Sequence, residues 1–303
     1  YGLMCNEKGM IIDDGVSTCI NDNHFIMTTT TGGAASVYSA LEMWLQTEWS
    51  DLDVHLSSVT DQFATVAVVG PNARNLMKVL CHDIDFERDN FKFMQWRPGT
   101  VCGVQARVMR ISFSGELAYE INIEANYGRY IWDEVALAGK PWNITPYGTE
   151  SMHVLRAEKG YIIVGQDTDG SMTPMDVNMK WILAKDKPFS YIGRRSFSIS
   201  ALNSDDRFQL VGLLTKDAHV VLPEGSHIIN NKGGSIGYVT SSYFSPILRR
   251  SIAMAQLKGG LSKMTEIVLV KIVQEKQGLK EIPCEVSSSV FYDIEGEKVD
   301  GNE

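Results

Sequence analysis

The sequence has few cysteines, and none is placed for a disulfide framework or a metal site. Cys5, Cys19, Cys81, Cys102 and Cys284 are scattered and odd in number, and no two form a Cys-x-x-Cys pair. Zinc sites usually show such pairs or grouped Cys and His, so no metal site is expected. We interpret the cysteines as reduced thiols and expect a cytoplasmic location.

Long hydrophobic runs and a basic surface are also missing. Apolar stretches such as Val66–Val69 and Ile267–Val270 are far shorter than the roughly 20 residues that cross a bilayer. A formal net charge of −9 and a pI near 5.2 disfavour partners that are bound through a phosphate backbone. Neither a membrane span nor nucleic-acid binding is expected.

The first residues show neither an initiator methionine nor a signal peptide. Tyr1–Gly9 has no basic start and no apolar run followed by a cleavage site. Because the chain opens directly on strand-like sequence, we expect that the N-terminal part of the fold is missing and that the natural start lies upstream.

What is present is typical of a globular protein with a substantial core. The chain has 303 residues, of which 44% are hydrophobic and 21% are charged. This length favours two domains. The polar stretch Asn203–Asp206 separates two patterns, so we predict one domain over residues 1–202 and another over 203–303.

The first predicted domain is α+β. Met10–Val16 and Phe25–Thr30 are interpreted as a hairpin, and the spacing of apolar residues predicts a helix over Ala34–Glu48. A strand at Thr65–Val69 leads through a Gly-Pro-Asn turn into a helix. Between Gly103 and Ile123 the pattern is extended. The spacing of apolar residues predicts helices near Tyr127–Ala138 and Thr149–Lys159, and Thr149 is a suitable N-cap for the second.

The second predicted domain is all β. Short apolar runs divided by Gly, Asn and Pro follow Asn203–Asp206, and no long helical pattern occurs among them. This pattern predicts a small antiparallel β-barrel or sandwich. The runs are Phe208–Leu214, His227–Asn230, Gly237–Ser241, Ser251–Gln256 and Glu266–Val273.

Three segments carry candidate functional residues. Strand alternation sends Asp13 and Asp14 to opposite faces, so only one of them can enter a given pocket. Glu120 alternates with Tyr119 and Ile121 and points away from its apolar neighbours. Arg156 lies at a helix end that is followed by a glycine stop and an acidic loop. Taken alone, the aspartates and Glu120 would be explained as residues on solvent-exposed strand faces, and Arg156 as part of a surface charge pair.

Taken together, these segments resemble the folate-binding aminomethyltransferase family typified by the glycine-cleavage T-protein. The family's glycine, short apolar run and Asp-Asp correspond to Gly9–Asp14. Its T-G-E-x-x-x-E strand corresponds to Ser114–Glu120, its L-R-x-E-x-G helix end to Leu155–Gly160, and its G-x-V-T-S signature to Gly237–Ser241. The resemblance implies the aminomethyltransferase folate-binding fold followed by a C-terminal antiparallel barrel.

Within that family the chain is most similar to the C-terminal part of the α subunit of heterotetrameric sarcosine oxidases. The similar segments include Asp14–Val16, Leu45–Trp49, Thr145–Glu150, Gly165–Gly170 and Ser241–Pro246. This resemblance implies partner subunits. It also implies FAD, FMN and NAD sites in missing regions or partners, since no Gly-x-Gly-x-x-Gly follows a strand here.

The resemblance also assigns roles to residues. It places Asp14 beside N5 and N10 of tetrahydrofolate as the catalytic carboxylate, and Glu120 against the pterin ring as an anchor. Phe113, where many relatives carry Tyr, would pack on the folate, and Ile26 and Met152 fall where T-proteins tend to have Tyr and Arg. Tyr147, Arg156 and Tyr243 would line the pocket or hold the glutamate tail, although structural roles fit them equally well.

The implied reaction converts the imine or formaldehyde-level carbon from sarcosine oxidation into 5,10-methylenetetrahydrofolate. One alternative is a T-protein-like aminomethyltransferase or a related folate-dependent demethylase. Another is a folate-binding assembly module without catalysis, which is disfavoured because Lys159–Ile162 lacks the cysteine of the family's iron-sulfur assembly factors.

Overall fold

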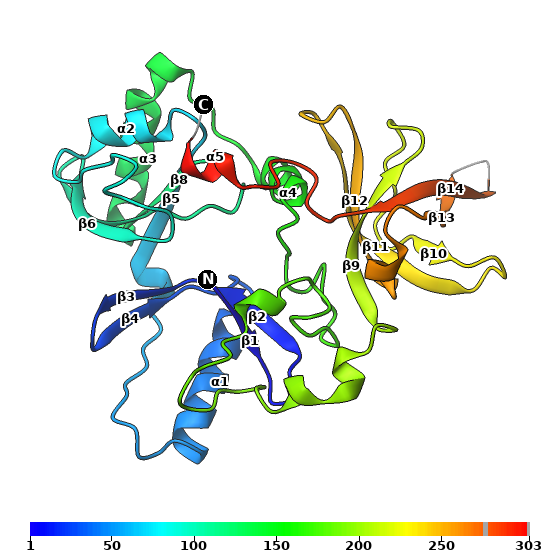
Figure 1. Cartoon of the computed structure of the whole chain (residues 1–303). Coiled ribbons are helices and arrows are strands. Elements are labelled where there is room, and N and C mark those ends of the chain that lie inside the picture. The colour runs from blue at the N-terminus through cyan, green and yellow to red at the C-terminus, as the bar shows by residue number, and fades with distance from the viewer. Residues whose placement is uncertain (275–277, 302–303) are drawn as a thin grey trace. The chain divides into compact units, whose positions relative to one another are not determined.

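The computed structural model describes residues 1–274 and 278–301, which fold into two compact units (Figure 1). The first unit consists of Tyr1–Val37 and Arg156–Ile294, and the second consists of Tyr38–Leu155 and the residues from Glu295 onward. The chain therefore passes between the units three times, and both units are built from segments that are distant in sequence.

Two short antiparallel pairs begin the first unit. Strand β1 (Gly2–Cys5) pairs with β2 (Ile11–Gly15), and β3 (Ser17–Asn21) pairs with β4 (His24–Met27). The predicted pairing of Met10–Val16 with Phe25–Thr30 is wrong, because the chain changes partners at Val16 and β2 takes the upstream strand. Helix α1 (Ala34–Thr47) matches its prediction and spans the point where the two units divide.

A closed six-stranded antiparallel barrel forms the C-terminal part of the first unit, with the order β10-β11-β12-β9-β14-β13 (Figure 1). This confirms the predicted barrel, to which the structure adds the strand β14. Val211, Val239, Ala255 and Val270 are among the inward residues of its core. The elements are β9 (Phe208–Thr215), β10 (His227–Ile229), β11 (Ser235–Ser245), β12 (Arg250–Lys258), η7 (Gly260–Lys263), β13 (Ile267–Gln274) and β14 (Gly278–Ser287).

A mostly irregular segment connects α4 to the barrel within the first unit. It contains the short 3₁₀ helices η4 (Lys180–Ile182), η5 (Ser196–Ser198) and η6 (Ser200–Asn203). Ile162, Met172 and Val177 from this segment pack with Ile11 of β2 and Met254 of β12. Apolar burial therefore joins the N-terminal strands to the barrel.

The second unit is a four-stranded sheet with helices on one face. The order is β5-β8-β7-β6, and all pairs are antiparallel. Helices α2 and α3 pack on the sheet, as Leu76, Ile131 and Tyr119 share one core (Figure 1). The elements are η1 (Thr60–Gln62), β5 (Phe63–Val69), α2 (Ala73–Leu80), β6 (Trp96–Val101), β7 (Val104–Met109), β8 (Ala118–Glu124), η2 (Ala125–Tyr127), α3 (Gly128–Ala138), η3 (Lys140–Trp142), α4 (Thr149–Glu158) and α5 (Glu297–Asp300).

The face of β8 that packs on the helices follows the predicted alternation. Tyr119, Ile121 and Ile123 lie in the core, whereas Glu120 lies on the opposite face of the sheet. The predicted extended stretch from Gly103 to Ile123 is interrupted, because β7 ends at Met109 and Phe113 lies in the loop that follows it. Among the described helices, none is long and apolar enough to span a membrane.

Candidate functional site

The two neighbouring aspartates on β2 have different surroundings, as alternation along a strand requires. Asp13 is only 1% exposed, whereas Asp14 is partly exposed. Asp13 accepts hydrogen bonds from Thr30 Oγ1 at 3.0 Å, from the Thr30 amide at 3.3 Å and from the Asp14 amide at 2.8 Å. Asp13 therefore joins β2 to the turn before α1, whereas Asp14 takes no part in this contact.

A glycine is required where that turn meets Asp13. A Cβ atom added at Gly33 would lie 1.8 Å from Asp13 Oδ2, and the Gly33 amide donates to Thr30 Oγ1 at 3.1 Å. The absence of a side chain at Gly33 lets the turn approach the buried carboxylate. The tight approach fixes the position of the strand that carries Asp14.

Among the described residues, the side chain of Tyr1 donates a hydrogen bond to the Asp14 carboxylate. The Tyr1 hydroxyl donates to Asp14 Oδ2 at 2.7 Å. Burial raises the pKa of Asp14 above its ordinary value, the neighbouring Asp13 charge raises it further, and the Tyr1 hydrogen bond lowers it. Asp14 thus combines partial exposure with an increased proton affinity, two properties that a proton-transferring carboxylate needs.

Glu120 lies in the middle of β8, opposite Ala67 on one side and Met109 on the other. Burial raises the pKa of its carboxyl group, and among the described residues no hydrogen bond reaches that group. The pKa of Tyr147 is raised by burial and by the Glu120 charge, so these two side chains are electrostatically coupled within the second unit. Glu120 is thus a partly buried acceptor for which the described part of the chain supplies no donor.

Phe113 lies in the loop between β7 and β8 and is 37% exposed. The loop is held by its own serines, because the Gly115 amide donates to Ser112 Oγ at 3.1 Å and the Glu116 amide donates to Ser114 Oγ at 3.2 Å. An exposed ring on an ordered loop can stack on a flat ligand.

Arg156, in contrast, is fully buried in the first unit. Its Nη1 donates to Asp167 Oδ2 at 2.6 Å, and its Nη2 donates to Ser241 Oγ at 2.6 Å. The carbonyl oxygen of Tyr161 accepts a third bond at 3.0 Å. Both terminal nitrogens of the guanidinium are thus engaged by protein groups, whereas its buried Nε has no hydrogen-bond partner among the described residues. The predicted folate contact of Arg156 stays a prediction.

Tyr243 lies on β11 close to that network. The centroid of its ring is 6.0 Å from the Arg156 guanidinium carbon. Burial raises the pKa of its hydroxyl, while hydrogen bonding with Gln166 lowers it. The sequence analysis did not identify Asp167 or Tyr1 as partners of these residues. A lone acidic or aromatic residue has no pattern that would reveal such a contact, although Asp167 falls within the similar segment Gly165–Gly170.

The six predicted site residues divide between the units. Asp14, Arg156 and Tyr243 belong to the first unit, and Phe113, Glu120 and Tyr147 belong to the second. Within the first unit the structure brings Arg156 and Tyr243 together, and within the second the charge of Glu120 contributes to the raised pKa of Tyr147. The roles of all six, and the convergence of Asp14 with Glu120, remain predictions.

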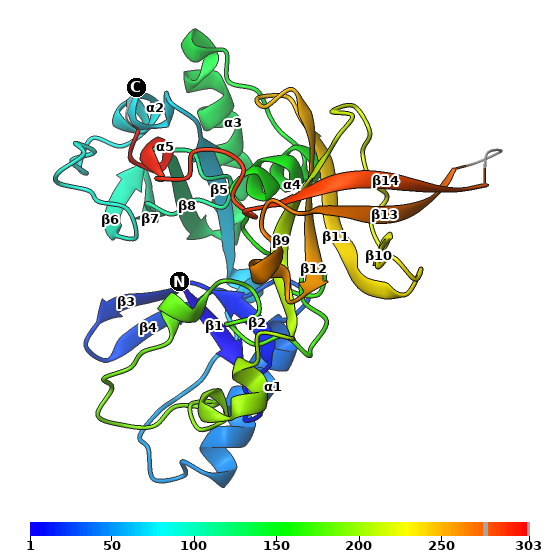
Figure 2. The same ribbon diagram turned by 45° about the vertical axis from the view of Figure 1, so that its right-hand side comes forward.

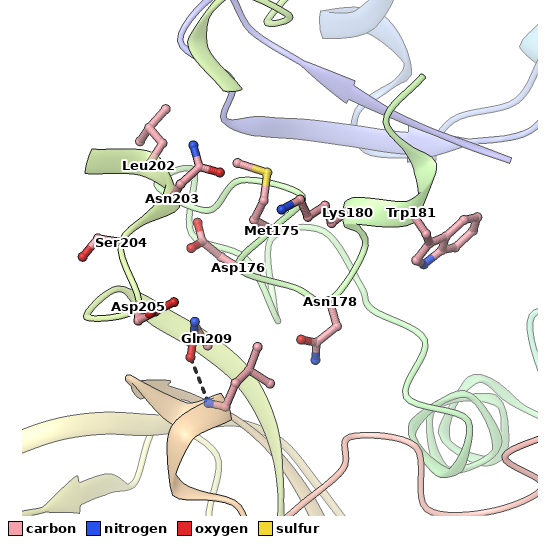
Figure 3. Close-up of a pocket in the computed structure, with 11 residues that line it drawn as sticks. Met175, Asp176, Asn178, Lys180, Trp181, Leu202, Asn203, Ser204, Asp205 and Gln209 are labelled. Atoms are coloured by element: carbon pink, nitrogen blue, oxygen red, sulfur yellow. Dashed lines mark hydrogen bonds between the residues drawn. The ribbon is translucent and has the colours of Figure 1, made fainter. Parts of the chain in front are cut away.

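A pocket of about 330 Å³ lies in the first unit and contains none of the six residues (Figure 3). Lys180 and Asn203 extend toward its interior, whereas the ring of Trp181 is turned away. Its buried acid, Asp176, is already paired with Arg207 at 2.7 Å. The described residues contain no group of three or more His, Cys, Asp or Glu side chains placed to hold a metal ion.

Comparison with known proteins covers nearly the whole chain. Residues 1–187 match the model of the GCVT N-terminal domain, and residues 209–293 match that of the glycine cleavage T-protein C-terminal barrel domain. A crystal structure of the glycine cleavage system aminomethyltransferase T from Bartonella henselae superposes with a TM-score of 0.81 over 97% of this chain and 75% of that chain, at 21% identity. That likeness shows the fold.

Curated relatives fall into two groups. Sarcosine oxidase subunit alpha of Corynebacterium sp. (strain P-1) is 47% identical over 99% of this chain and 31% of its own length, and that of Rhizobium meliloti (strain 1021) is 37% identical over 99% of this chain and 30% of its own length. This chain thus spans about a third of these relatives. An aminomethyltransferase of Thermotoga petrophila is 30% identical over 84% of this chain and 66% of its own length. Two family models in their usual order, matched over folds of the expected kind, show that the chain belongs to the glycine cleavage T-protein (GCVT) family.

Proposed function

We propose that this chain is the tetrahydrofolate-binding, one-carbon-transfer part of a sarcosine-oxidising enzyme. The higher identity to sarcosine oxidase α subunits, 47% against 30% for the aminomethyltransferase, supports this choice within the family. The proposal includes other oxidase subunits as partners and the functional division into residues 1–202 and 203–303. It also includes a cytoplasmic location, with which the five free cysteines agree.

The observation that carries the proposal is the state of Glu120. Its side chain is partly buried on the face of β8 opposite the core, burial raises the pKa of its carboxyl group, and no hydrogen bond from the described residues reaches that group. Partial burial of a carboxylate without a protein donor carries a cost in free energy that donors on a ligand would reduce. A pterin edge presents adjacent N–H groups, and a carboxylate can accept two of them in parallel. Glu120 therefore fits the role of pterin anchor.

Asp14 fits the role of catalytic carboxylate. Its hydrogen bond from Tyr1 holds one oxygen in place, and burial raises its pKa, which favours a role in proton transfer. When ionised, Asp14 stabilises positive charge that develops on a nearby nitrogen. Asp13 does not take this role, because its oxygens are already bound by Thr30 and by the Asp14 amide.

Tetrahydrofolate supplies the two nitrogens, N5 and N10, to which the carbon becomes bonded. In the proposed reaction that carbon is the N-methyl carbon of sarcosine, and a flavin bound outside this chain would accept the two electrons that its oxidation releases before transfer. Glycine keeps the nitrogen of sarcosine and leaves. Phe113, Tyr147 and Tyr243 would line the folate site, and FAD, FMN and NAD would bind in other regions or subunits.

The test uses the full-length protein that contains this chain, purified with the subunits that accompany it. With sarcosine and tetrahydrofolate present, we expect 5,10-methylenetetrahydrofolate to replace free formaldehyde as the product. Asp14→Ala should lower this product about a hundredfold or more and leave sarcosine-dependent flavin reduction intact. The matched control is Asp22→Ala, which changes an exposed aspartate in the turn of the β3–β4 pair. Undiminished product formation by Asp14→Ala would overturn the assignment.

The family also supports a second candidate, an aminomethyltransferase that acts on a different donor. The matched family models and the relative from Thermotoga petrophila favour it. The same assay separates the two, because this enzyme would form no methylenetetrahydrofolate from sarcosine. A non-catalytic folate-binding module would bind tetrahydrofolate and form none from any donor.

A further inference from the structure

The C-terminal segment of the chain folds into the second unit and places one carboxylate among three arginines. Asp300 Oδ1 lies 3.3 Å from Arg110 Nη2, and Asp300 Oδ2 lies 3.4 Å from Arg88 Nη2. The carbonyl oxygen of Asp300 accepts a hydrogen bond from Arg74 of α2 at 3.1 Å. Figure 2 shows α5, which ends at Asp300, beside α2.

Arg110 is the unusual member of this cluster, because its side chain is 1% exposed. Its Nη1 donates to the carbonyl oxygen of Phe91, and its Nη2 donates to that of Val299 at 3.3 Å. Asp300 supplies the one carboxylate within ion-pair distance of Arg110 among the described residues. A buried guanidinium needs both hydrogen bonds and a counter-ion, so the C-terminal segment completes the site of Arg110.

The same segment touches the other end of the loop that carries Phe113. Arg110 directly precedes this loop, which runs from Ile111 to Glu116, and Leu117 directly follows it. Gly301 has a φ of +69°, and a Cβ added there would lie 3.0 Å from Leu117 Cδ2. Residues 299–301 therefore contact both residues that bracket the loop.

We infer that residues 299–301 position the Ile111–Glu116 loop, and that Asp300 and Arg110 are positioning residues for ligand binding at Phe113 and Glu120. The segment holds the exit of β7 through Arg110 and the entry of β8 through Leu117. Phe113 lies within this loop, and Glu120 lies four residues after its last residue, Glu116. This inference rests on the proposed function, because the ligand concerned is a reduced folate.

The experiment uses the same full-length protein that contains this chain, purified with the subunits that accompany it. Asp300→Ala and the milder Asp300→Asn are compared with Glu87→Ala, which removes an exposed carboxylate of the same unit from its pair with Lys78. The affinity for 5-formyltetrahydrofolate is measured by calorimetry, and amide hydrogen exchange is followed over residues 111–116. We expect about tenfold weaker binding and faster exchange for both Asp300 variants. Glu87→Ala should match the wild type, and Asp300→Glu should recover part of the affinity.

The outcomes separate the two hypotheses. Wild-type protein that binds no reduced folate refutes the proposed function, while the exchange rates still decide whether the segment orders the loop. If Asp300→Ala fails to fold, Asp300→Asn provides the comparison. Unchanged affinity and unchanged exchange in a folded Asp300 variant overturn the inference even when the wild type binds folate.

Discussion

Arg156 Nη1 and Asp167 Oδ2 lie 2.6 Å apart, and neither side chain is exposed to solvent. The other carboxylate oxygen of Asp167 accepts hydrogen bonds from Thr240 Oγ1 at 2.6 Å and from Ser241 Oγ at 2.8 Å. The backbone carbonyl of Asp167 also accepts from Gln256 Nε2 at 2.9 Å. The pair thus joins the C-terminal end of α4 to two strands of the barrel, and both carboxylate oxygens of Asp167 accept hydrogen bonds.

Removal of one partner from this pair should be strongly destabilising. Asp167→Ala leaves the Arg156 charge buried without a counter-ion, which costs about 3–5 kcal/mol of unfolding free energy. Urea denaturation measures the loss. Asp169→Ala is the control, since this exposed aspartate bonds to Ser171 at 2.6 Å and should cost about 1 kcal/mol or less. Equal losses of unfolding free energy in the two variants would show that the buried ion pair contributes no more to stability than an exposed hydrogen bond.

The turn that approaches Asp13 provides a test with an adjacent control. Gly33→Ala places a methyl group against the Asp13 carboxylate and should cost about 1–3 kcal/mol through displacement of packed groups. Gly32→Ala has open space around the added methyl group and should change stability little. Thermal unfolding of both variants is sufficient. We also expect Gly33→Ala, but not Gly32→Ala, to weaken reduced-folate binding, because the turn holds the strand of Asp14.

Because Glu120 is partly buried, removal of its negative charge, by protonation or by substitution with Gln, should increase the stability of the folded state. Because the folded-state pKa is raised above the ordinary 4.5, the folded state binds the proton more tightly than the unfolded state. The stability that this protonation contributes is present below the ordinary pKa and is lost as the pH rises through the folded-state value. Glu120→Gln should therefore raise the thermal midpoint at pH 7 by about 2–4 °C.

Two further comparisons test whether the charge of Glu120 causes the difference in thermal midpoint. The difference between Glu120→Gln and wild type should shrink as the pH falls below 4.5, since both side chains are then neutral. Glu124→Gln changes an exposed residue at the end of the same strand and should leave the midpoint unchanged. Folate affinity should fall for Glu120→Gln in spite of its greater stability. A less stable Glu120→Gln at pH 7 would contradict the assigned cause.

The hydrogen bond from Tyr1 should control the titration of Asp14. Tyr1→Phe removes a donor that favours the ionised carboxylate, so the pKa of Asp14 should rise further above its ordinary value. Carbon-13 NMR of the carboxyl group follows the titration directly. Tyr130→Phe is the control, because its hydroxyl donates to the carbonyl of Cys102 at 3.1 Å. An unshifted Asp14 in Tyr1→Phe would exclude a functional role for this contact.

Periodic elements were accessible to sequence reasoning. The apolar spacing predicted helices α1, α3 and α4 to within one or two residues, and alternation correctly placed Tyr119 inside and Glu120 on the other face. The barrel was also anticipated from its short apolar runs. These predictions succeed because each depends on residues within one turn or two strand positions of each other.

Strand partners and the contacts of single polar residues were not accessible in this way. The pairing of β2 with β1, rather than with the segment near Phe25, depends on which backbone edge is free in the assembled unit. Asp167 has partners 11, 73 and 74 residues away along the chain. No local pattern carries information over such separations.

The opposite orientations of Asp13 and Asp14 follow from their adjacent positions alone, because side chains alternate along any strand. Which of the two becomes buried could be known only from the folded chain, in which Asp13 is buried and Asp14 stays partly exposed beside Tyr1. Alternation separates the two faces of a strand, whereas the face that is covered depends on Thr30 and Gly33, which reach Asp13 only after the chain has folded back.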